Sequence, residues 1–442
     1  MPAPNVVVLG TGMAGFGAAW RLHAEGLKPI LYDKNAYYGG HTMSFRYESG
    51  FLFDVGPHIS FTKNERIQNL FADSVEQRYE TLQVSLNNYW QGYWPLHPAQ
   101  LHLYGMPHDL VVKVISDFAD VNYGPERPIH NYSDWLYSSF GKAFAENFPM
   151  KYTRKYHTTE AANMSIDWLG PRFYRPTLQE VLQGALSPTP KNDYVHYVTH
   201  FRYPSEGGFR LFLNKFVPLS DLRLNHELVS IDPRAHELKF ANGAIASYDS
   251  LVSSVPLPDL IPMIKGAPQD VLDASRRLAC STCVLVNIGI DREDLSSSHM
   301  TYFYDEDICF TRLGFPHMLS PRNAPPGCGN IQAEVYFSKK YKPLTGHPDD
   351  YIEPVIRDLR RCGLLRDNDR ILCRKAMLLP YANIIFDLER ADALKTVHGF
   401  LDDLGIAYCG RYGDWGYLWT DDAFVSGERA AVRALSAVME AK

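Results

Sequence analysis

Short apolar runs alternate with amphipathic stretches at the start of the chain. Residues 6–9 are apolar and mostly β-branched, as in a buried parallel strand. A glycine-rich segment at 10–15 follows at once, and residues 16–25 have the composition of a helix. A second apolar strand at 29–32 ends at Asp33. This order of strand, turn, helix and strand predicts the first βαβ unit of an α/β domain.

Further apolar runs lie in the second half of the chain. Residues 284–290 and 331–337 predict strands, which we expect to form one wall of a ligand pocket. The Asn-Gly pair at 242–243 is expected to turn a hairpin between a strand at 226–231 and a returning strand at 248–255.

The glycines of the first unit have separate physical tasks. Gly10 permits a tight turn, Gly12 lets a pyrophosphate approach the backbone, and Gly15 lets the helix pack closely on the strand. The helix N-terminus faces the phosphates, and Asp33 is placed to accept hydrogen bonds from ribose hydroxyls. The sequence therefore predicts a dinucleotide site formed by Gly10, Gly12, Met13, Ala14, Gly15, Asp33 and Lys34.

Composition and charge narrow the class of protein. The chain has 442 residues, enough for two or three domains, and its 44 Lys+Arg against 50 Asp+Glu give a net charge of −6. Because nucleic-acid binders usually present a basic face, nucleic acid is not expected as a partner. Aromatic residues make up 13% and include 27 Tyr, which favours an aromatic-lined pocket for a small-molecule substrate.

The N-terminus and the cysteines indicate a cytoplasmic protein. No apolar run is long enough to span a membrane, and the N-terminus lacks the basic start and apolar core of a secretory signal. Seven scattered cysteines fit a reducing compartment. Cys280 and Cys283 run directly into an apolar strand, so we interpret them as small residues of that strand and predict no metal site.

Two motifs downstream of Asp33 identify the dinucleotide. Residues 39–41 read Gly-Gly-His, and residues 54–58 read Asp-Val-Gly-Pro-His after a hairpin-like segment at 45–53. Together they resemble the superfamily of flavin amine oxidases, protoporphyrinogen oxidases, phytoene desaturases and UDP-galactopyranose mutases. The resemblance implies FAD rather than NAD as the cofactor.

The resemblance recurs to the end of the chain. Residues 201–209 are similar to the Tyr-Pro-x-x-Gly-Gly segment of the protoporphyrinogen-oxidase-like branch. Residues 226–256 resemble the segment that returns to the FAD domain, and residues 408–427 resemble the closing flavin motif. The further FAD-binding residues that the resemblance implies are Gly39, Gly40, His41, Gly56, Pro57, His58, Val229 (at the adenine), Gly410, Arg411, Asp414, Asp422 and Ala423.

The fold class that the resemblance implies is α/β, or α+β overall. A Rossmann-like FAD-binding domain of the type with two dinucleotide-binding motifs carries an inserted substrate domain of mixed sheet and helices. We expect the FAD domain at 1–75, 205–260 and 400–442, and the substrate domain at 76–204 and 261–399. The second domain should contain a helix at 110–121 and, at 76–200, a Tyr-rich region facing the flavin.

Three functions stay open at this point. The resemblance implies an FAD-dependent oxidoreductase that oxidises a small organic substrate by hydride transfer to flavin N5. A UDP-galactopyranose-mutase-like enzyme, which acts without net redox change on a nucleotide sugar through reduced flavin, is the alternative. Residues 56–65, 152–156 and 410–417 resemble the mutase motifs, although Gly416 replaces an arginine and Tyr156 departs from the pattern. A catalytically inactive flavin-binding scaffold is the third possibility.

The candidate catalytic residues are His58, Lys155 and Arg172. His58 is expected beside the flavin ring, and Lys155 belongs to the mutase-like stretch. The planar guanidinium of Arg172 suits an anionic substrate group. The oligomeric state, the electron acceptor and covalent attachment of FAD are left open by the sequence.

Overall fold

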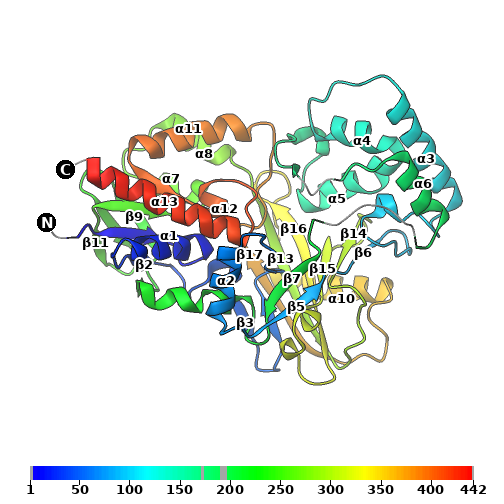
Figure 1. Cartoon of the computed structure of the whole chain (residues 1–442), viewed down its shortest axis with the longest axis horizontal. Helices are drawn as coiled ribbons and strands as arrows, with labels where there is room; N and C mark the ends of the chain where they lie inside the picture. Colours follow the sequence, from blue (N-terminus) through cyan, green and yellow to red (C-terminus); the bar gives the residue numbers. More distant parts are fainter. Residues whose placement is uncertain (1–2, 171–173, 190–196, 441–442) are drawn as a thin grey trace.

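A computed structural model describes residues 3–170, 174–189 and 197–440. Figure 1 shows a lobe that contains both ends of the chain, a central sheet region, and a helical lobe built mainly from residues 99–186. The predicted α/β fold class is confirmed, with a Rossmann-like parallel sheet and a second, mixed sheet.

The lobe that contains both chain ends is built on a five-stranded parallel sheet in the order β18-β12-β1-β2-β8. Its strands are β1 (Val6–Leu9), β2 (Ile30–Tyr32), β8 (Asp221–Arg223), β12 (Ser250–Ser253) and β18 (Ile406–Tyr408). Helices α1 (Met13–Ala24) and α13 (Thr420–Glu440) lie side by side on this sheet (Figure 1).

Every residue of β1 is buried because both faces of the sheet are covered. Val6 and Val8 belong to one hydrophobic cluster with Phe16 of α1 and Phe424 of α13. Val7 faces the opposite side, in a cluster with residues of α7 (Leu257–Met263), α8 (Gln269–Arg277) and α11 (Arg390–Asp403). This two-sided burial is the reason the strand is continuously apolar.

A three-stranded antiparallel sheet follows η5 (Phe209–Leu219) and β8. It consists of β9 (Leu228–Asp232), β10 (Glu237–Phe240) and β11 (Ile245–Ser247). The Asn242-Gly243 turn joins β10 to β11, with Gly243 at φ +84°. The hairpin prediction was therefore wrong in its partners, because 248–255 contributes β12 to the parallel sheet and β10 and β11 were not recognised.

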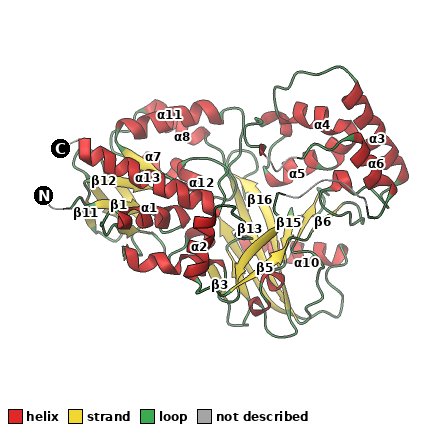
Figure 2. Cartoon of the chain, in the orientation of Figure 1, coloured by secondary structure: helices red, strands yellow, loops and turns green. Residues whose placement is uncertain are grey.

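The second main sheet has six strands in the order β17-β13-β16-β15-β14-β6 (Figure 2). Its strands are β6 (Leu86–Tyr89), β13 (Ser281–Ile290), β14 (Met300–Phe303), β15 (Arg312–Gly314), β16 (Gly329–Ser338) and β17 (Ile371–Leu379). β13 and β16 are buried along their whole length and pair antiparallel, which confirms the strands predicted at 284–290 and 331–337.

The helical lobe lies beyond this sheet, at the right of Figure 1. Its helices are α3 (His108–Tyr123), α4 (Tyr132–Asn147), α5 (Pro149–Tyr156) and α6 (Leu178–Leu186), so the helix predicted at 110–121 is confirmed. The remaining named elements are β3 (Ser44–Arg46), β4 (Leu52–Asp54), β5 (Tyr79–Gln83), β7 (His200–Pro204), α2 (Glu65–Ser74), α9 (Pro316–Leu319), α10 (Ile352–Arg361) and α12 (Gly410–Gly413).

The chain passes repeatedly between the two main sheets. The hairpin predicted at 45–53 is the β3–β4 pair, with Phe45 opposite Phe53. Helices α8 and α11 pack on each other beside the parallel sheet, although the sequence assigned both largely to the substrate domain. The predicted domain boundaries remain predictions. Within the described residues, we find no helix that is long and apolar enough to cross a membrane.

Candidate functional site

The glycine-rich turn after β1 forms the first wall of the site. Gly10 has φ +103°, and a Cβ on Gly15 would lie 2.0 Å from the Gly10 carbonyl oxygen. Only glycine therefore fits at both positions. α1 begins directly after Gly12, with no capping side chain and no acidic residue in its first turn. Its first backbone N–H groups, including those of Met13 and Ala14, are thus available to an anion.

Asp33 connects the end of β2 to this turn. Its Oδ2 accepts hydrogen bonds from the Thr11 backbone N–H (2.9 Å) and hydroxyl (2.6 Å). Its Oδ1 accepts from the backbone and side-chain N–H groups of Asn35, both at 2.9 Å. A carboxylate offers about four acceptor positions. Asp33 thus fixes the turn, and a ribose hydroxyl would have to share or replace one of these bonds.

The second glycine pair lies directly against the first turn. The Gly39 N–H donates to the Thr11 carbonyl at 2.8 Å. A Cβ on Gly40 would lie 3.3 Å from the Gly12 Cα. Gly39 and Gly40 both have positive φ, +113° and +52°. The structure therefore brings 10–15 and 39–41 together, whereas the neighbouring Lys34 is exposed.

Two neutral histidines follow this glycine pair. His41 Nδ1 hydrogen-bonds the Tyr412 hydroxyl at 2.9 Å, and burial is the main cause that lowers the pKa of His41 to about 3. His58 Nδ1 lies 3.0 Å from the Gly56 carbonyl, to which it donates. Burial lowers the pKa of His58 to about 4, although the Gly56 hydrogen bond opposes the shift. Both rings are therefore uncharged at neutral pH.

Arg411 carries a buried positive charge close to both histidines. Its Nε and Nη2 donate to the Leu418 carbonyl at 3.0 and 2.6 Å, and its guanidinium lies 5.2 Å from the Tyr417 ring centre. Among the described residues it has no carboxylate partner. Arg411 contributes to the lowered pKa values of His41 and His58, after burial.

The closing segment of the chain completes this wall. The Asp414 carboxylate accepts from the Ser426 hydroxyl at 2.5 Å, and Ser426 Oγ accepts from the Gly410 N–H at 2.9 Å. A Cβ on Gly410 would approach Ala14 to 2.8 Å, so this segment lies at the start of α1. Asp422 accepts from the Trp419 N–H at 3.1 Å, and Ala423 follows it in the first turn of α13.

The position of Val229, the residue expected at the adenine, follows from the contacts of the residues just before it. The His226 N–H donates to the Asp33 carbonyl at 2.8 Å, which places the start of β9 beside the end of β2. The Val229 side chain is 49% exposed. The structure thus places the residues just before the strand that carries Val229 beside Asp33.

A cluster of tyrosines around Arg312 was not found from the sequence. Arg312, on β15, donates from Nε to Glu334 Oε2 at 2.8 Å and from Nη2 to the Tyr336 hydroxyl at 3.1 Å. Its guanidinium lies 5.1 Å from the centre of the Tyr156 ring. Tyr152 stacks on Tyr156 at 5.2 Å. We call Arg312, Glu334, Tyr152, Tyr156, Tyr302 and Tyr336 the tyrosine–arginine cluster.

This cluster faces the predicted flavin motifs. A Cβ on Gly314 would lie 3.9 Å from Pro57, and Arg312 projects from the same side of β15. Arg312 also contributes, after burial, to the lowered pKa of His58. Tyr156 and Tyr336 belong to one hydrophobic cluster with Met43 and Val55. Their spacing in the sequence carries no periodic signal, because the cluster joins α5, β14, β15 and β16.

Of the other two candidate catalytic residues, only Lys155 belongs to the part of the chain that the structure describes. Lys155 is 8% exposed, and its ammonium donates to the carbonyls of Phe303 (3.2 Å) and Asp305 (2.7 Å). Burial lowers the pKa of Lys155 to about 7. Lys155 thus braces the chain after β14. Arg172 lies outside the described residues.

The comparisons with known proteins define the class. The sequence pattern of the flavin containing amine oxidoreductases matches residues 125–435, and that of an NAD(P)-binding Rossmann-like domain matches residues 8–74. The chain belongs to the family of flavin containing amine oxidoreductases. The superfamily expected from the motifs is confirmed, and so is the prediction of a flavin-dependent enzyme of the oxidoreductase class, although the mutase alternative also fits the similar structures.

Three particular proteins show how the chain is related within this class. A 4,4'-diapolycopene oxygenase from Methylomonas sp is 24% identical over 423 residues, covering 81% of each chain. A crystal structure of reduced UDP-galactopyranose mutase superposes with TM-score 0.91 and 25% identity, covering 98% of this chain and 96% of the other. A protoporphyrinogen oxidase-like structure from Exiguobacterium sp. 255-15 shares the fold, with TM-score 0.72, 16% identity and full coverage of both chains.

Proposed function

We propose that the flavin is FAD. The open N-terminus of α1 fits a pyrophosphate, since a Cβ on Gly12 would meet no protein atom closer than 3.9 Å. Asp33 and the start of β9 provide a second region at the adenosine end, which FMN would not need. Gly10, Gly12, Gly15, Gly39 and Gly40 would hold the diphosphate, and His41, Pro57, His58 and Arg411 would surround the ring.

We further propose that the substrate is a hydroxyl-rich, sugar-type molecule, such as a nucleotide sugar, and that the enzyme acts as a mutase. The observation that carries this proposal is the tyrosine–arginine cluster beside residues 56–58. Tyrosine hydroxyls and guanidinium N–H groups hydrogen-bond sugar hydroxyls and phosphate oxygens. An apolar polyene could not pair with the N–H groups of Arg312 that Glu334 and Tyr336 leave free, which is costly in a buried site. The whole-chain similarity to the mutase adds support.

Arg312, Arg411 and His58 would have separate roles in the proposed reaction. When bound, the flavin supplies the electron-rich ring on which the mutase type of reaction depends. Arg312 is held in place by Glu334 and Tyr336, so its remaining N–H groups are oriented before substrate binds. Arg411 attracts negative charge to its side of the site, because no carboxylate neutralises it among the described residues. Neutral His58 holds the loop at Gly56.

A second candidate is oxidation of a substrate by hydride transfer to flavin N5. The family pattern and the similarity to the 4,4'-diapolycopene oxygenase favour it. A small polar substrate would use the same cluster, and His58 and Arg411 would lie beside the acceptor ring in the same way.

Flavin reduction separates the two reactions. HPLC of heat-released cofactor should first identify FAD. Protein reduced with dithionite under argon should then isomerise UDP-galactopyranose, the oxidised protein should not, and Arg312→Met should lose at least tenfold in kcat/KM. Bleaching of the oxidised flavin by a substrate, without dithionite, would support hydride transfer instead. No conversion of any nucleotide sugar by reduced protein would contradict the mutase proposal.

A further inference from the structure

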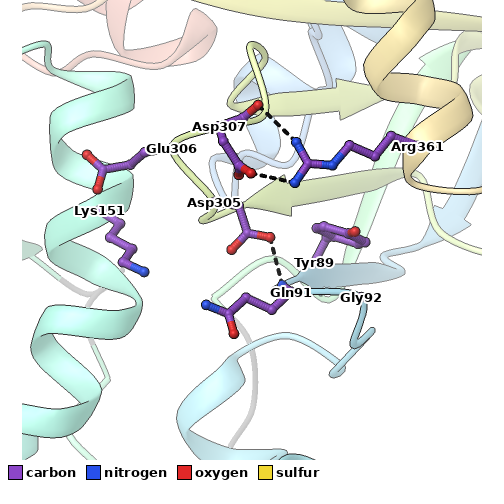
Figure 3. A pocket seen from close by; sticks show the side chains of 8 residues that line it. All are labelled: Tyr89, Gln91, Gly92, Lys151, Asp305, Glu306, Asp307 and Arg361. Atoms are coloured by element: carbon purple, nitrogen blue, oxygen red, sulfur yellow. Dashed lines mark hydrogen bonds and ion pairs between the residues drawn. The ribbon is translucent and has the colours of Figure 1, made fainter.

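A polar pocket opens beside Lys151 of helix α5, and none of the residues that line it belongs to the tyrosine–arginine cluster. It has a volume of about 630 Å³ and is lined by Tyr89, Gln91, Lys151, Asp305, Asp307 and Arg361, among others (Figure 3). This volume lies in the range of about 300–1,000 Å³ that is typical of small-molecule sites. None of its lining residues belongs to the flavin motifs. We call it the outer pocket.

Most of the charges at the outer pocket neutralise one another. Arg361 pairs with Asp307, and Arg154 forms a two-point ion pair with Glu306, at 2.7 and 2.9 Å. Figure 3 shows the Asp307–Arg361 pair closing one side of the pocket. The charged groups of these two ion pairs bind each other and are therefore not free to bind a ligand. A pocket with this many carboxylates therefore does not present an acidic surface.

Two charged groups remain for a ligand. Lys151 extends from α5 toward the pocket, and its ammonium has no hydrogen-bond or ion-pair partner among the described residues. Opposite it, Asp305 is 8% exposed and accepts from the Gln91 N–H through Oδ2 at 2.7 Å. Asp305 Oδ1 has no such donor within the part of the chain that the structure describes. One wall thus offers a cation and the other a buried acceptor.

Hydrogen bonds outside the pocket fix the positions of Asp305 and of the Gln91-Gly92 turn. Lys155, one helical turn after Lys151, donates to the Asp305 carbonyl at 2.7 Å and to the Phe303 carbonyl at 3.2 Å. On the other side, the Gln91-Gly92 turn is closed by two hydrogen bonds between Trp90 and Tyr93, at 2.9 and 3.0 Å. Asp305 and Gln91 are therefore preorganised.

An aromatic surface continues from the pocket to solvent. Tyr89 lines the pocket, and the Trp94 ring lies 4.9 Å from the Tyr89 ring. Trp94 is 39% exposed, and Tyr93 on the same hairpin is 40% exposed. Exposed aromatic rings beside hydroxyl-binding polar groups suit the apolar faces of sugar rings.

We propose that the outer pocket binds an acidic saccharide, with a carboxylate at Lys151 and hydroxyl groups at Asp305 and Gln91. A free amino acid would satisfy the same two charges, but it would leave most of a pocket of about 630 Å³ empty. The aromatic surface at Trp94 would receive the next sugar unit. This binding function is independent of the reaction at the flavin site.

Isothermal titration calorimetry with trigalacturonic acid tests the proposal on the flavin-loaded protein. We expect saturable binding of trigalacturonic acid and binding at least tenfold weaker for maltotriose, the neutral trisaccharide control. L-Glutamate should not bind measurably. Absence of trigalacturonate binding, or equal affinity for L-glutamate, would overturn the assignment.

Three variants locate the binding. Lys151→Gln should weaken trigalacturonate binding about tenfold or more, since it removes the charge-assisted bond. Asp305→Asn keeps an acceptor for the Gln91 N–H but replaces the free oxygen with a donor, and it should weaken binding similarly. Lys113→Gln, on the exposed face of α3, is the control and should bind normally. Unchanged binding in Lys151→Gln, or a change of the flavin spectrum on addition of trigalacturonate, would place the ligand elsewhere and refute the proposal.

Discussion

At the scale of single residues, two buried carboxyl groups behave differently. Asp54 accepts hydrogen bonds from Ser44 and Tyr203, yet burial raises its pKa to about 6. Glu334 is 1% exposed and pairs with Arg312. The Asp54 carboxyl group has only neutral hydrogen-bond partners, whereas the Glu334 carboxylate forms an ion pair with Arg312. Their substitutions should therefore have opposite consequences.

Asp54→Asn should remove a pH-dependent loss of stability. Because the pKa of Asp54 is raised from 3.8 to about 6 in the fold, the free energy of unfolding should fall as pH rises between these values. The full effect is about 3 kcal/mol. Urea unfolding should be measured at pH 4.5 and 7.5. Relative to the natural protein, the free energy of unfolding of the variant should be higher at pH 7.5 than at pH 4.5. The exposed control Asp403→Asn should show no such pH-dependent increase in the free energy of unfolding. The expectation would be contradicted if Asp54→Asn and the natural protein changed in stability by the same amount between the two pH values.

Glu334→Gln should destabilise the protein by about 3–5 kcal/mol, because it leaves the Arg312 charge buried without its partner. Combining it with Arg312→Met removes both charges. The double variant should therefore lose less free energy of unfolding than the two single variants lose in sum. A double-mutant cycle of unfolding free energies would measure this difference. Additive losses would show that the two side chains do not depend on each other.

At the scale of elements, glycines let α1 and α13 approach unusually closely. A Cβ on Gly17 would lie 2.0 Å from the Phe424 carbonyl oxygen, and a Cβ on Gly427 would lie 1.9 Å from that of Ala14. This contact fixes the N-terminal part of α13 against the start of α1, where the diphosphate is proposed to bind. The helix pair therefore links stability to cofactor binding.

Gly427→Ala should cost about 1–3 kcal/mol or more and reduce the bound flavin, because a backbone cannot move aside as a flexible side chain can. Gly399→Ala is the matched control. Gly399 lies in the exposed part of α11, and its Cβ would have no neighbour within 4 Å. That variant should gain up to about 1 kcal/mol from helix propensity. Thermal unfolding and flavin absorbance measure both effects, and equal behaviour of the two variants would argue against the close contact.

At the scale of the whole molecule, the proposed FAD site draws on segments from the first residues to the last. Residues 10–15, 39–41, 56–58 and 410–414 meet around it, while the six-stranded sheet presents Arg312 from the other side. A ligand that touches so many separate segments should stabilise the entire fold.

FAD should therefore raise the melting temperature of the apoprotein in proportion to the logarithm of its concentration. At 100 times Kd the stabilisation is about 2.7 kcal/mol. Gly12→Ala should abolish this shift but leave the apoprotein unchanged, because its Cβ meets no protein atom closer than 3.9 Å and only the phosphates would be displaced. Differential scanning fluorimetry provides the measurement. A normal FAD response in Gly12→Ala would refute the placement of the diphosphate.

The sequence by itself determined the features that depend on neighbours along the chain. The turn at 10–15, the first two strands of the parallel sheet, β1 and β2, and the long strands β13 and β16 follow from local glycine requirements and from apolar runs that are buried in the fold. The same local motifs were sufficient to identify the superfamily. They failed at 226–255, because an Asn-Gly turn defines a hairpin without saying which strands it joins.

Only the tertiary structure decided what meets across the site. Arg312, Glu334 and Tyr156 come from three elements, and no spacing in the sequence announces their contact. Lys155 looked like a flavin or substrate ligand by its motif, but the fold directs its ammonium to backbone carbonyls beside the outer pocket. Side-chain direction depends on how α5 is docked against β14, and that docking results from packing of the whole core, which local pattern does not encode.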